Sequence, residues 1–268
     1  MKIKDFLQVD KDTTLTALSY LLDKSKTFLL LNDEIELNDD ISERLSDIIK
    51  KVKKGYPLQY ALGVWNFYGL DFKTDQRALI PRPETELLVE KILKANINKD
   101  KILDIGTGTG SIAISLAYNL KKSKVIGLDI SKDAVELALE NKEKFGLDNV
   151  DFIVSDLFSS IEERFNLIVS NPPYINKKDY ENLEKPLFYE PKNALVGGDD
   201  GLFFYKKIIA EAKNYLENEG YLFLEIGYDQ KDQIISLLKE NSYTKIQAYK
   251  DYNGFDRIVI GQVKEDLC

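Results

Sequence analysis

The stretch Leu103-Asp-Ile-Gly-Thr-Gly-Thr-Gly110 joins a short apolar run to a turn with three glycines. An apolar run followed by glycines is typical of a buried strand that turns sharply into a helix. Glycines allow a ligand to approach the backbone closely, and the free N–H groups at a helix start favour polar ligand atoms. This stretch therefore predicts the first strand and the ligand-binding turn of an α/β domain.

Around this turn, strand-like and helix-like segments alternate. The predicted strands are 101–106, 124–130, 150–155, 165–170, 220–227, 244–250 and 257–263, and the predicted helices are 110–121, 132–145, 201–216 and 229–241. Alternation of this kind favours a doubly wound, mostly parallel sheet, here Rossmann-like and seven-stranded, which a final antiparallel pair closes.

The chain before this sheet has a different pattern. Residues 1–55 show the spacing of amphipathic helices and predict a small helical domain, in which Thr13 and Thr14 are candidate N-caps. Residues 56–78 are aromatic and extended, which predicts a hairpin linker. We therefore expect a helical domain at 1–55, a linker at 56–78 and the sheet domain at 79–268.

Two carboxylates follow the next two strands. Asp129 ends the second strand about 20 residues after the glycines, where a carboxylate can accept hydrogen bonds from ribose hydroxyls. Asp156, after the third strand, can accept from an adenine amino group, with Leu157 and Phe158 beside the ring. The spacing G-x-G-x-G, with Ser111 next, disfavours a pyrophosphate site. Plain turn glycines and an aspartate that caps a helix remain the alternatives.

A second motif, Asn171-Pro-Pro-Tyr174, follows the strand 165–170, at the sheet edge where ligands bind. An amide nitrogen is a poor nucleophile because resonance delocalises its lone pair. If the Asn171 side-chain oxygen and the Pro172 carbonyl each accept one N–H, that lone pair can point at a sulfonium methyl. Proline leaves its carbonyl free and fixes the backbone, and Tyr174 can cover the flat amide or simply pack. The two motifs together predict a methyltransferase.

Composition excludes several other chemistries. The formal net charge is −8 with acidic and basic residues interspersed, which argues against a nucleic-acid footprint. The chain has no histidine, so histidine bases and histidine metal sites are excluded, and its one cysteine, Cys268, cannot form an internal disulfide or a thiolate zinc site. No apolar run is long enough for a membrane span and no signal layout is present, so we expect a soluble cytoplasmic protein without a metal.

Several motifs in order resemble the bacterial peptide chain release factor glutamine methyltransferases, the HemK-type family. The motifs are Pro57-Leu-Gln-Tyr60 with Gly63, Leu79-Ile-Pro-Arg-Pro-Glu-Thr-Glu86, Leu103 to Gly110, Ser170-Asn-Pro-Pro-Tyr-Ile175, Tyr189-Glu-Pro191 with Ala194-Leu195, Leu224-Glu-Ile-Gly227, and Asp251 with Gly254, Asp256 and Arg257. The resemblance spans about residues 55–263.

This resemblance implies S-adenosylmethionine as the methyl donor and N5-methylation of the glutamine in the Gly-Gly-Gln motif of release factors. It implies cofactor contacts at Gly106, Thr107, Gly108, Thr109, Gly110, Asp129, Leu157 and Asn171, candidate contacts to the methionine end at Arg82 and Thr85, and a substrate glutamine held by Asn171, Pro172, Pro173 and Tyr174. It also suggests that the helical domain docks the substrate. We expect a monomer.

Four other functions are compatible with parts of the pattern. A glutamine methyltransferase of a ribosomal protein would share both motifs, and the segment Pro81–Glu86 favours the release-factor branch. An amino methyltransferase of nucleobases would use the same rim, although the acidic balance disfavours it. A nicotinamide-dependent oxidoreductase conflicts with the glycine spacing, and an adaptor without activity would leave both motifs unused.

Overall fold

The computed structural model describes residues 1–264; Cys268 lies outside the described residues. Contacts divide the chain into two compact units, one made of Met1–Trp65 with Glu184–Tyr189, the other of Asn66–Leu183 with the residues from Glu190 onward. We describe each unit by itself.

The helices of the first unit are α1 (Ile3–Leu7), α2 (Lys11–Leu22), α3 (Lys26–Leu31), α4 (Asp39–Lys53), α5 (Leu58–Leu62) and the 3-10 turn η1 (Lys185–Tyr189). They bury an apolar cluster that includes Leu18 and Leu45, as the helical spacing predicts. The predicted caps Thr13 and Thr14 are wrong. Both lie inside α2, and Asp10 is the N-cap, because its carboxylate accepts from the Thr13 N–H at 3.1 Å.

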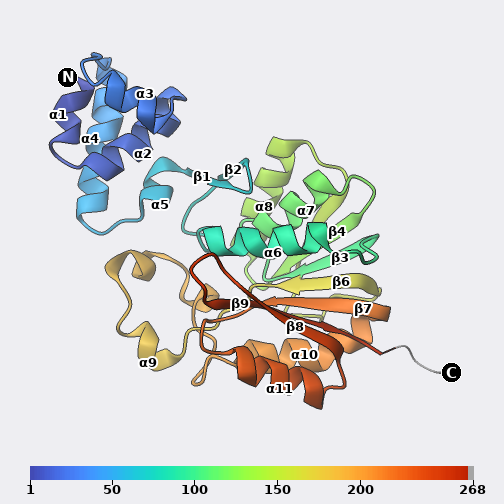
Figure 1. Cartoon of the computed structure of the whole chain (residues 1–268). Helices are drawn as coiled ribbons and strands as arrows, with labels where there is room; N and C mark the ends of the chain where they lie inside the picture. The colour runs from blue at the N-terminus through green and yellow to red at the C-terminus, as the bar shows by residue number, and fades with distance from the viewer. Residues whose placement is uncertain (265–268) are drawn as a thin grey trace. The chain divides into compact units, whose positions relative to one another are not determined.

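The second unit is a three-layer α/β domain (Figure 1). Its elements are β1 (Val64–Phe67, shared with the first unit), β2 (Leu70–Lys73), α6 (Pro83–Lys94), β3 (Lys101–Ile105), α7 (Ser111–Asn119), β4 (Lys124–Asp129), α8 (Lys132–Phe145), β5 (Val150–Val154), β6 (Phe165–Ser170), α9 (Lys177–Tyr180), η2 (Lys192–Ala194), α10 (Phe203–Tyr215), β7 (Leu216–Glu225), α11 (Lys231–Glu240), β8 (Thr244–Lys250) and β9 (Asp256–Gln262). Strands β1 and β2 form a separate hairpin.

Within residues 1–264 the main sheet has seven strands in the order β5-β4-β3-β6-β7-β9-β8. The first five are parallel, and β9 runs antiparallel to both β7 and β8. The predicted Rossmann-like sheet with a closing antiparallel pair is therefore confirmed. The chain order reverses between β3 and β6, so the loops after these two strands border the crevice where ligands bind in such sheets.

Alternating strand residues build two apolar layers. Ile102 of β3 faces the layer under α6, α7 and α8, and the adjacent Leu103 faces the layer under α10 and α11. Side chains of a strand point to opposite faces in turn, so a sheet buried on both sides needs apolar residues at nearly every position. The short runs before Gly106 and Asn171 meet this need.

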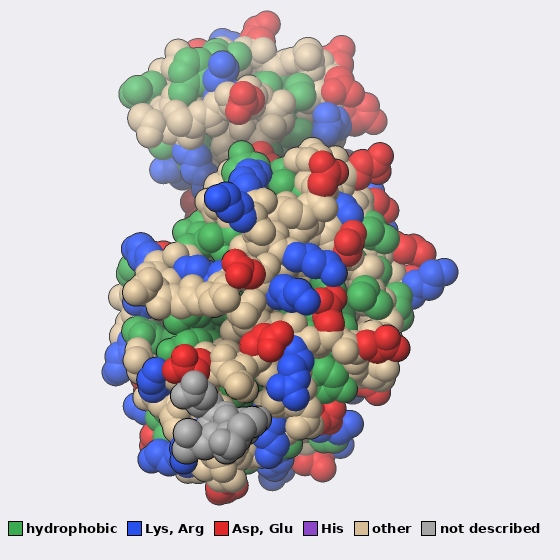
Figure 2. All heavy atoms as spheres, turned by 90° about the vertical axis from the view of Figure 1, so that its right-hand side faces the viewer, with side chains coloured by type: hydrophobic (Ala, Val, Ile, Leu, Met, Phe, Trp, Pro, Cys, Tyr) green, Lys and Arg blue, Asp and Glu red, His purple; other side chains and the backbone are tan. Residues whose placement is uncertain are grey.

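Charged side chains of both signs intermingle on the molecular face shown in Figure 2, as the interspersed charges of the sequence suggest. No helix among residues 1–264 combines the length and the apolar character needed to cross a membrane.

Candidate active site

The glycine turn lies between β3 and α7. Gly106 and Gly108 have φ angles of +73° and +55°, which favour glycine. A Cβ added at Gly106 would meet no atom within 4 Å, so the space beside it is open. At Gly110 a Cβ would lie 3.0 Å from Phe152 and from Ile114, so this glycine serves helix packing and not ligand approach.

Asp129, at the end of β4, is fixed by the turn. Its Oδ2 accepts from the Gly108 N–H at 3.0 Å, and its Oδ1 accepts from the Ser131 N–H at 2.9 Å. Burial raises the pKa of Asp129 above its ordinary value, and these two backbone donors oppose that rise. A carboxylate held in this way keeps lone pairs for a diol such as a ribose.

A cavity of about 260 Å³ opens at this edge of the sheet. One water occupies roughly 30 Å³ in the liquid, so the cavity is of ligand size. Of the sequence-predicted site residues, those that line it are Gly106, Gly108, Asp129, Asp156, Leu157, Asn171, Pro172 and Pro173. The structure thus brings together residues that follow β3, β4, β5 and β6, as the carboxyl ends of parallel strands require.

Asn171 connects the cavity to helix α6. Its Nδ2 donates to the Thr85 hydroxyl at 3.1 Å. Thr85 is buried in the first turn of α6 and does not line the cavity. Its contact is therefore with the Asn171 side chain, and the Asn171 Oδ1 is the amide atom left for a ligand.

The backbone of the Asn-Pro-Pro-Tyr rim is clamped from behind. The Ile175 N–H donates to the Leu195 carbonyl at 3.0 Å, and the Gln230 side chain donates to the Tyr174 carbonyl at 3.2 Å. A Cβ at Gly201 would come within 2.3 Å of the Tyr174 carbonyl oxygen, so only glycine permits this approach. The rim is consequently held by residues far along the chain.

Three other predicted residues do not line the cavity. The Tyr174 ring packs against the apolar cluster under α10, where burial raises its pKa to about 12. The Thr107 hydroxyl donates to Asp104 Oδ2 at 2.7 Å, and Thr109 is buried with its carbonyl bonded to Asn141. Thr107 and Thr109 thereby stabilise the glycine turn, and Tyr174 packs the rim against the core.

Arg82 is committed to an ion pair. Its guanidinium lies 2.5 Å from Glu190, whose other carboxylate oxygen accepts from the Ile80 N–H at 3.0 Å. Glu190 is buried and Arg82 does not line the cavity. The pair ties the start of α6 to the segment before η2.

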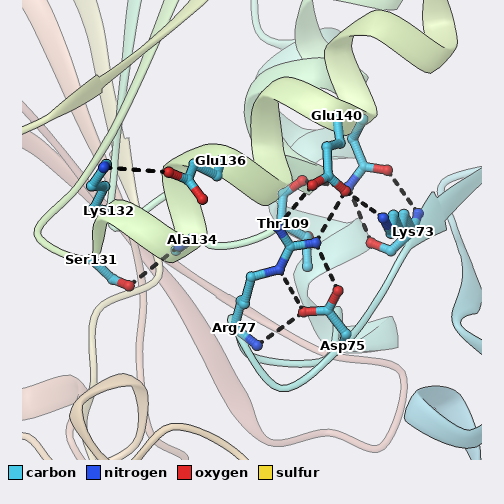
Figure 3. Close-up of polar contacts among 10 residues, drawn as sticks. Lys73, Asp75, Arg77, Thr109, Ser131, Lys132, Ala134, Glu136 and Glu140 are labelled. Carbon is cyan, nitrogen blue, oxygen red and sulfur yellow. Dashed lines mark hydrogen bonds and ion pairs between the residues drawn. The ribbon is translucent and has the colours of Figure 1, made fainter.

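Sequence reasoning missed a second border of the cavity, made by Arg77, Ala78 and Leu79. Arg77 forms ion pairs with Asp75 and with Glu140, each at 2.8 Å. Figure 3 shows both contacts. The hydrogen bond from Arg77 to Glu140, and after it the one from Lys73, lowers the pKa of Glu140 to about 2. The alternating charges of Lys73, Asp75 and Arg77 were the available sequence signal. They do not reveal that Lys73 and Arg77 pair with Glu140 on α8.

Asn141 of α8 was also missed. It is fully buried and bonds the Thr109 carbonyl at 2.9 Å, the Lys73 carbonyl at 3.1 Å and the Lys73 N–H at 2.7 Å. It thereby joins the end of the hairpin to the glycine turn. A lone polar residue on the apolar face of a predicted helix was the signal for it.

Comparison with known proteins agrees with this geometry. A family model described as a methyltransferase domain matches residues 97–264, and one described as the PrmC N-terminal domain matches residues 12–63. Fold and site together define an S-adenosylmethionine-dependent methyltransferase. The chain is 43% identical to the release factor glutamine methyltransferase of Buchnera aphidicola from Schizaphis graminum, across 92% of this chain and 90% of that protein. The chain belongs to the release factor glutamine methyltransferase family.

Further relatives have the same name. That of Fusobacterium nucleatum is 42% identical, with 91% of this chain and 71% of the relative covered, and that of Haemophilus influenzae is 36% identical, with 94% and 91% covered. Among solved structures, a methyltransferase of Pyrococcus furiosus has a TM-score of 0.57 at 20% identity and covers 85% of this chain and 100% of its own. This last likeness supports the fold alone.

The cavity residues fit S-adenosylmethionine. The open space at Gly106 admits a ligand against the backbone, and the fixed Asp129 carboxylate suits the ribose hydroxyls. Leu157 and Ile130 line the same cavity with apolar surface suited to a base, whereas Phe158 is buried and does not line it. The described residues contain no cluster of three or more potential metal ligands.

Proposed function

We propose that this chain transfers the methyl group of S-adenosylmethionine to the side-chain amide nitrogen, N5, of the glutamine in the Gly-Gly-Gln motif of peptide chain release factors. The observation that carries the proposal is 43% identity over 92% of the chain to a release factor glutamine methyltransferase. The position of Asn171 on the rim of the cavity supports it.

In the proposed reaction the rim orients the acceptor. The Asn171 Oδ1 and the Pro172 carbonyl each accept one N–H of the glutamine amide, which turns the nitrogen lone pair toward the cavity. Pro172 is buried and Asn171 is anchored on Thr85, so both acceptors are held before the substrate arrives. Pro173 continues the rim, and Tyr174 stiffens it from behind.

S-adenosylmethionine supplies an electrophilic methyl group on a sulfonium centre. Gly106, Gly108 and Asp129 would hold its sugar end, and Asp156 with Leu157 would hold its base. Alignment of this kind supplies about 7–11 kcal/mol in favourable cases. The methylated amide loses its proton readily to water, so no strong base is needed in a chain without histidine.

The helical unit is proposed to dock the release factor, as part of a domain division at residues 1–55, 56–78 and 79–268. We further propose a monomeric cytoplasmic enzyme that acts on protein and does not bind nucleic acid. The mixed charges on the face in Figure 2 and the net charge of −8 support a protein acceptor over a phosphate backbone.

The test is incubation of the purified protein with S-adenosylmethionine and an unmodified release factor, followed by mass spectrometry of the Gly-Gly-Gln peptide. One added methyl group on that glutamine is the expected result. A release factor in which this glutamine is replaced by asparagine is the matched control. Bound cofactor without methylation would refute the proposed acceptor and turn attention to ribosomal proteins and nucleobases.

A further inference from the structure

Two stretches of the cavity wall are joined through one buried carboxylate. The first stretch, Arg77–Leu79, lines the cavity shortly before α6, and the second, within residues 191–194, lines it at η2. The residue that follows the first stretch is Ile80, and the residue that precedes the second is Glu190. These two residues are hydrogen-bonded to each other, so the contact lies one residue away from both stretches.

Both oxygens of the Glu190 carboxylate have a donor. Its Oε2 accepts from the Ile80 N–H at 3.0 Å, and its Oε1 accepts from the Arg82 guanidinium at 2.5 Å. The Glu190 side chain is 2% exposed, whereas that of Arg82 is 30% exposed. A charge buried to this extent is tolerated when it is paired and hydrogen-bonded, so Glu190 holds its two partners firmly.

Prolines stiffen the backbone on either side of this contact. Pro81 lies between Ile80 and Arg82, and Pro191, with a φ of −58°, directly follows Glu190. Because the proline ring fixes φ, the backbone beside each proline has little freedom to absorb a displacement. The position of the Glu190 carboxylate therefore sets the position of the wall residues next to it.

The far end of the η2 stretch is fastened to the rim. The Leu195 carbonyl accepts from the Ile175 N–H at 3.0 Å, and the Gly197 N–H donates to the Ile175 carbonyl at 2.9 Å. At its near end the stretch begins at Glu190, the residue at which the chain returns to the second unit. Loss of the Glu190 contacts would therefore free one end of the stretch and leave its rim end in place.

We propose that Glu190 is a positioning residue that, together with Arg82, holds these two stretches of the wall in contact and thereby retains S-adenosylmethionine in the cavity. The inference rests on the part of the proposed function that places this cofactor in the cavity. Neither Glu190 nor Arg82 lines the cavity, so their effect passes through the wall residues.

The principal test measures the dissociation constant of S-adenosylmethionine for the full chain by calorimetry. In Glu190→Gln one amide oxygen replaces two carboxylate oxygens, so it can accept from Ile80 or from Arg82 but not from both. We expect the dissociation constant to rise roughly tenfold, because a hydrogen bond to a charged group is lost and the near end of the η2 stretch is freed. The kcat at saturating cofactor should stay within about threefold of wild type, since the rim end remains bonded to Ile175.

Two variants of Arg82 distinguish the ion pair from a direct contact between Arg82 and the cofactor. Arg82→Met removes the charge and leaves the Glu190 Oε1 without its donor, so it should weaken binding about as much as Glu190→Gln. Nη2 of Arg82 makes the bond to Glu190, and a lysine can supply such a single donor. Arg82→Lys should therefore bind the cofactor within about threefold of wild type.

Asp251→Asn is the matched control. The Asp251 side chain is 5% exposed, pairs with Arg257 at 3.3 Å and accepts from the Asn253 and Phe255 N–H groups, so it has the same kinds of partner as Glu190. Neither Asp251 nor its neighbours in sequence line the cavity. We expect Asp251→Asn to lower the Tm, as Glu190→Gln does, but to keep the dissociation constant within about twofold of wild type.

A second measurement needs no bound cofactor. Hydrogen–deuterium exchange of the Ile80 amide, followed by mass spectrometry of peptides that contain it, reports the bond to Glu190 in the free protein. We expect faster exchange at Ile80 in Glu190→Gln than in the wild type and in Asp251→Asn. Peptides from β3 should exchange equally in all three proteins.

The outcomes separate a positioning role from a merely structural one. A lower Tm with wild-type cofactor affinity in Glu190→Gln would overturn the inference, and so would unchanged exchange at Ile80. Weaker binding in Arg82→Met but not in Glu190→Gln would also overturn it, in favour of a direct contact between Arg82 and the cofactor.

The placement of the cofactor is tested separately. If the wild type bound S-adenosylmethionine and Asp129→Ala bound it equally well, the proposed placement in this cavity would be wrong. The exchange of the Ile80 amide would still show in that case whether Glu190 holds the two stretches together.

Discussion

For Asn171 the sequence predicts which functional group lies at the site, a side-chain amide, but it does not predict how that amide is oriented. The motif predicts an amide at the end of β6, and the structure adds that its nitrogen is held by Thr85. Thr85 itself was expected at the methionine end of the cofactor, yet it lies buried behind the rim. A prediction about a single residue of this site therefore depends on which of its atoms is free to contact a ligand, as the Asn171 oxygen is here.

Replacing Asn171 with alanine removes the proposed acceptor of the glutamine N–H. We expect kcat to fall by about 100-fold or more, because the nitrogen lone pair is no longer aligned. The affinity for S-adenosylmethionine, measured by calorimetry, should fall much less. Asn176→Ala, which removes the N-cap of α9, is the control. Near-normal turnover in Asn171→Ala would contradict the proposed role of the rim.

Replacing Asp129 with alanine removes both the proposed ribose acceptor and the partner of the Gly108 and Ser131 N–H groups. Hydrogen bonds to a charged group contribute about 1.5–3 kcal/mol each, so the dissociation constant of S-adenosylmethionine should rise roughly 10- to 100-fold. The rate at saturating cofactor should change less. Asp129→Asn keeps one acceptor oxygen, so its affinity for S-adenosylmethionine should lie between those of the wild type and Asp129→Ala. Unchanged cofactor affinity in Asp129→Ala would refute the assignment of Asp129 to the ribose.

At the scale of elements, periodicity predicted most strands and helices because burial on both faces of a sheet leaves a strong local pattern. Helix starts were harder, since Thr13, Thr14 and Asp10 are all possible caps and only the backbone geometry selects Asp10. The segment after β2 was the weakest prediction. Its link to α8 depends on Asn141, which is distant in sequence.

Replacing Asn141 with alanine should detach the end of the hairpin from the glycine turn. It leaves the Lys73 N–H and the Thr109 carbonyl without their buried partner, and an unsatisfied buried group costs about 1–3 kcal/mol. We expect a loss of about 2 kcal/mol in the free energy of unfolding and a higher KM for S-adenosylmethionine.

Glu136→Ala on the same helix is the control for this change. Among the described residues Glu136 makes only an exposed ion pair, with Lys132, so both stability in a denaturant titration and the KM should stay close to wild type. If Asn141→Ala matched this control, the tether would have no role in forming the cavity.

At the scale of the whole molecule, two buried carboxyls dominate the response to pH near neutrality. Burial raises the pKa of Asp104 and of Glu225 to about 7, from ordinary values near 4. Asp104 is fully buried and its Oδ1 has no partner in the described part of the chain. The chain has no histidine, so no histidine titration opposes these two groups.

The native state keeps protons on these carboxyls at pH values where the unfolded chain has lost them, so stability falls as pH rises from about 4 to 7. We expect the wild-type Tm to fall between pH 5 and pH 8, where a loss of 1 kcal/mol corresponds to about 2–4 °C. In Glu225→Gln one of the two groups no longer titrates, so the fall should be smaller. A wild-type Tm that rises over this range in differential scanning calorimetry would contradict the assignment.

The sequence by itself determined the α/β class, the order of the elements, the glycine turn, Asp129 and the Asn-Pro-Pro-Tyr rim. These features follow from local patterns, because burial on a strand or helix repeats every few residues and the carboxyl ends of parallel strands share one edge. Only the tertiary structure decided that Glu184–Tyr189 packs with the first unit, that Arg82 pairs with Glu190, and that the Asn171 side chain donates to Thr85. Each of these contacts joins residues far apart in the chain, and a hydrogen bond between distant residues leaves no periodic trace in the sequence.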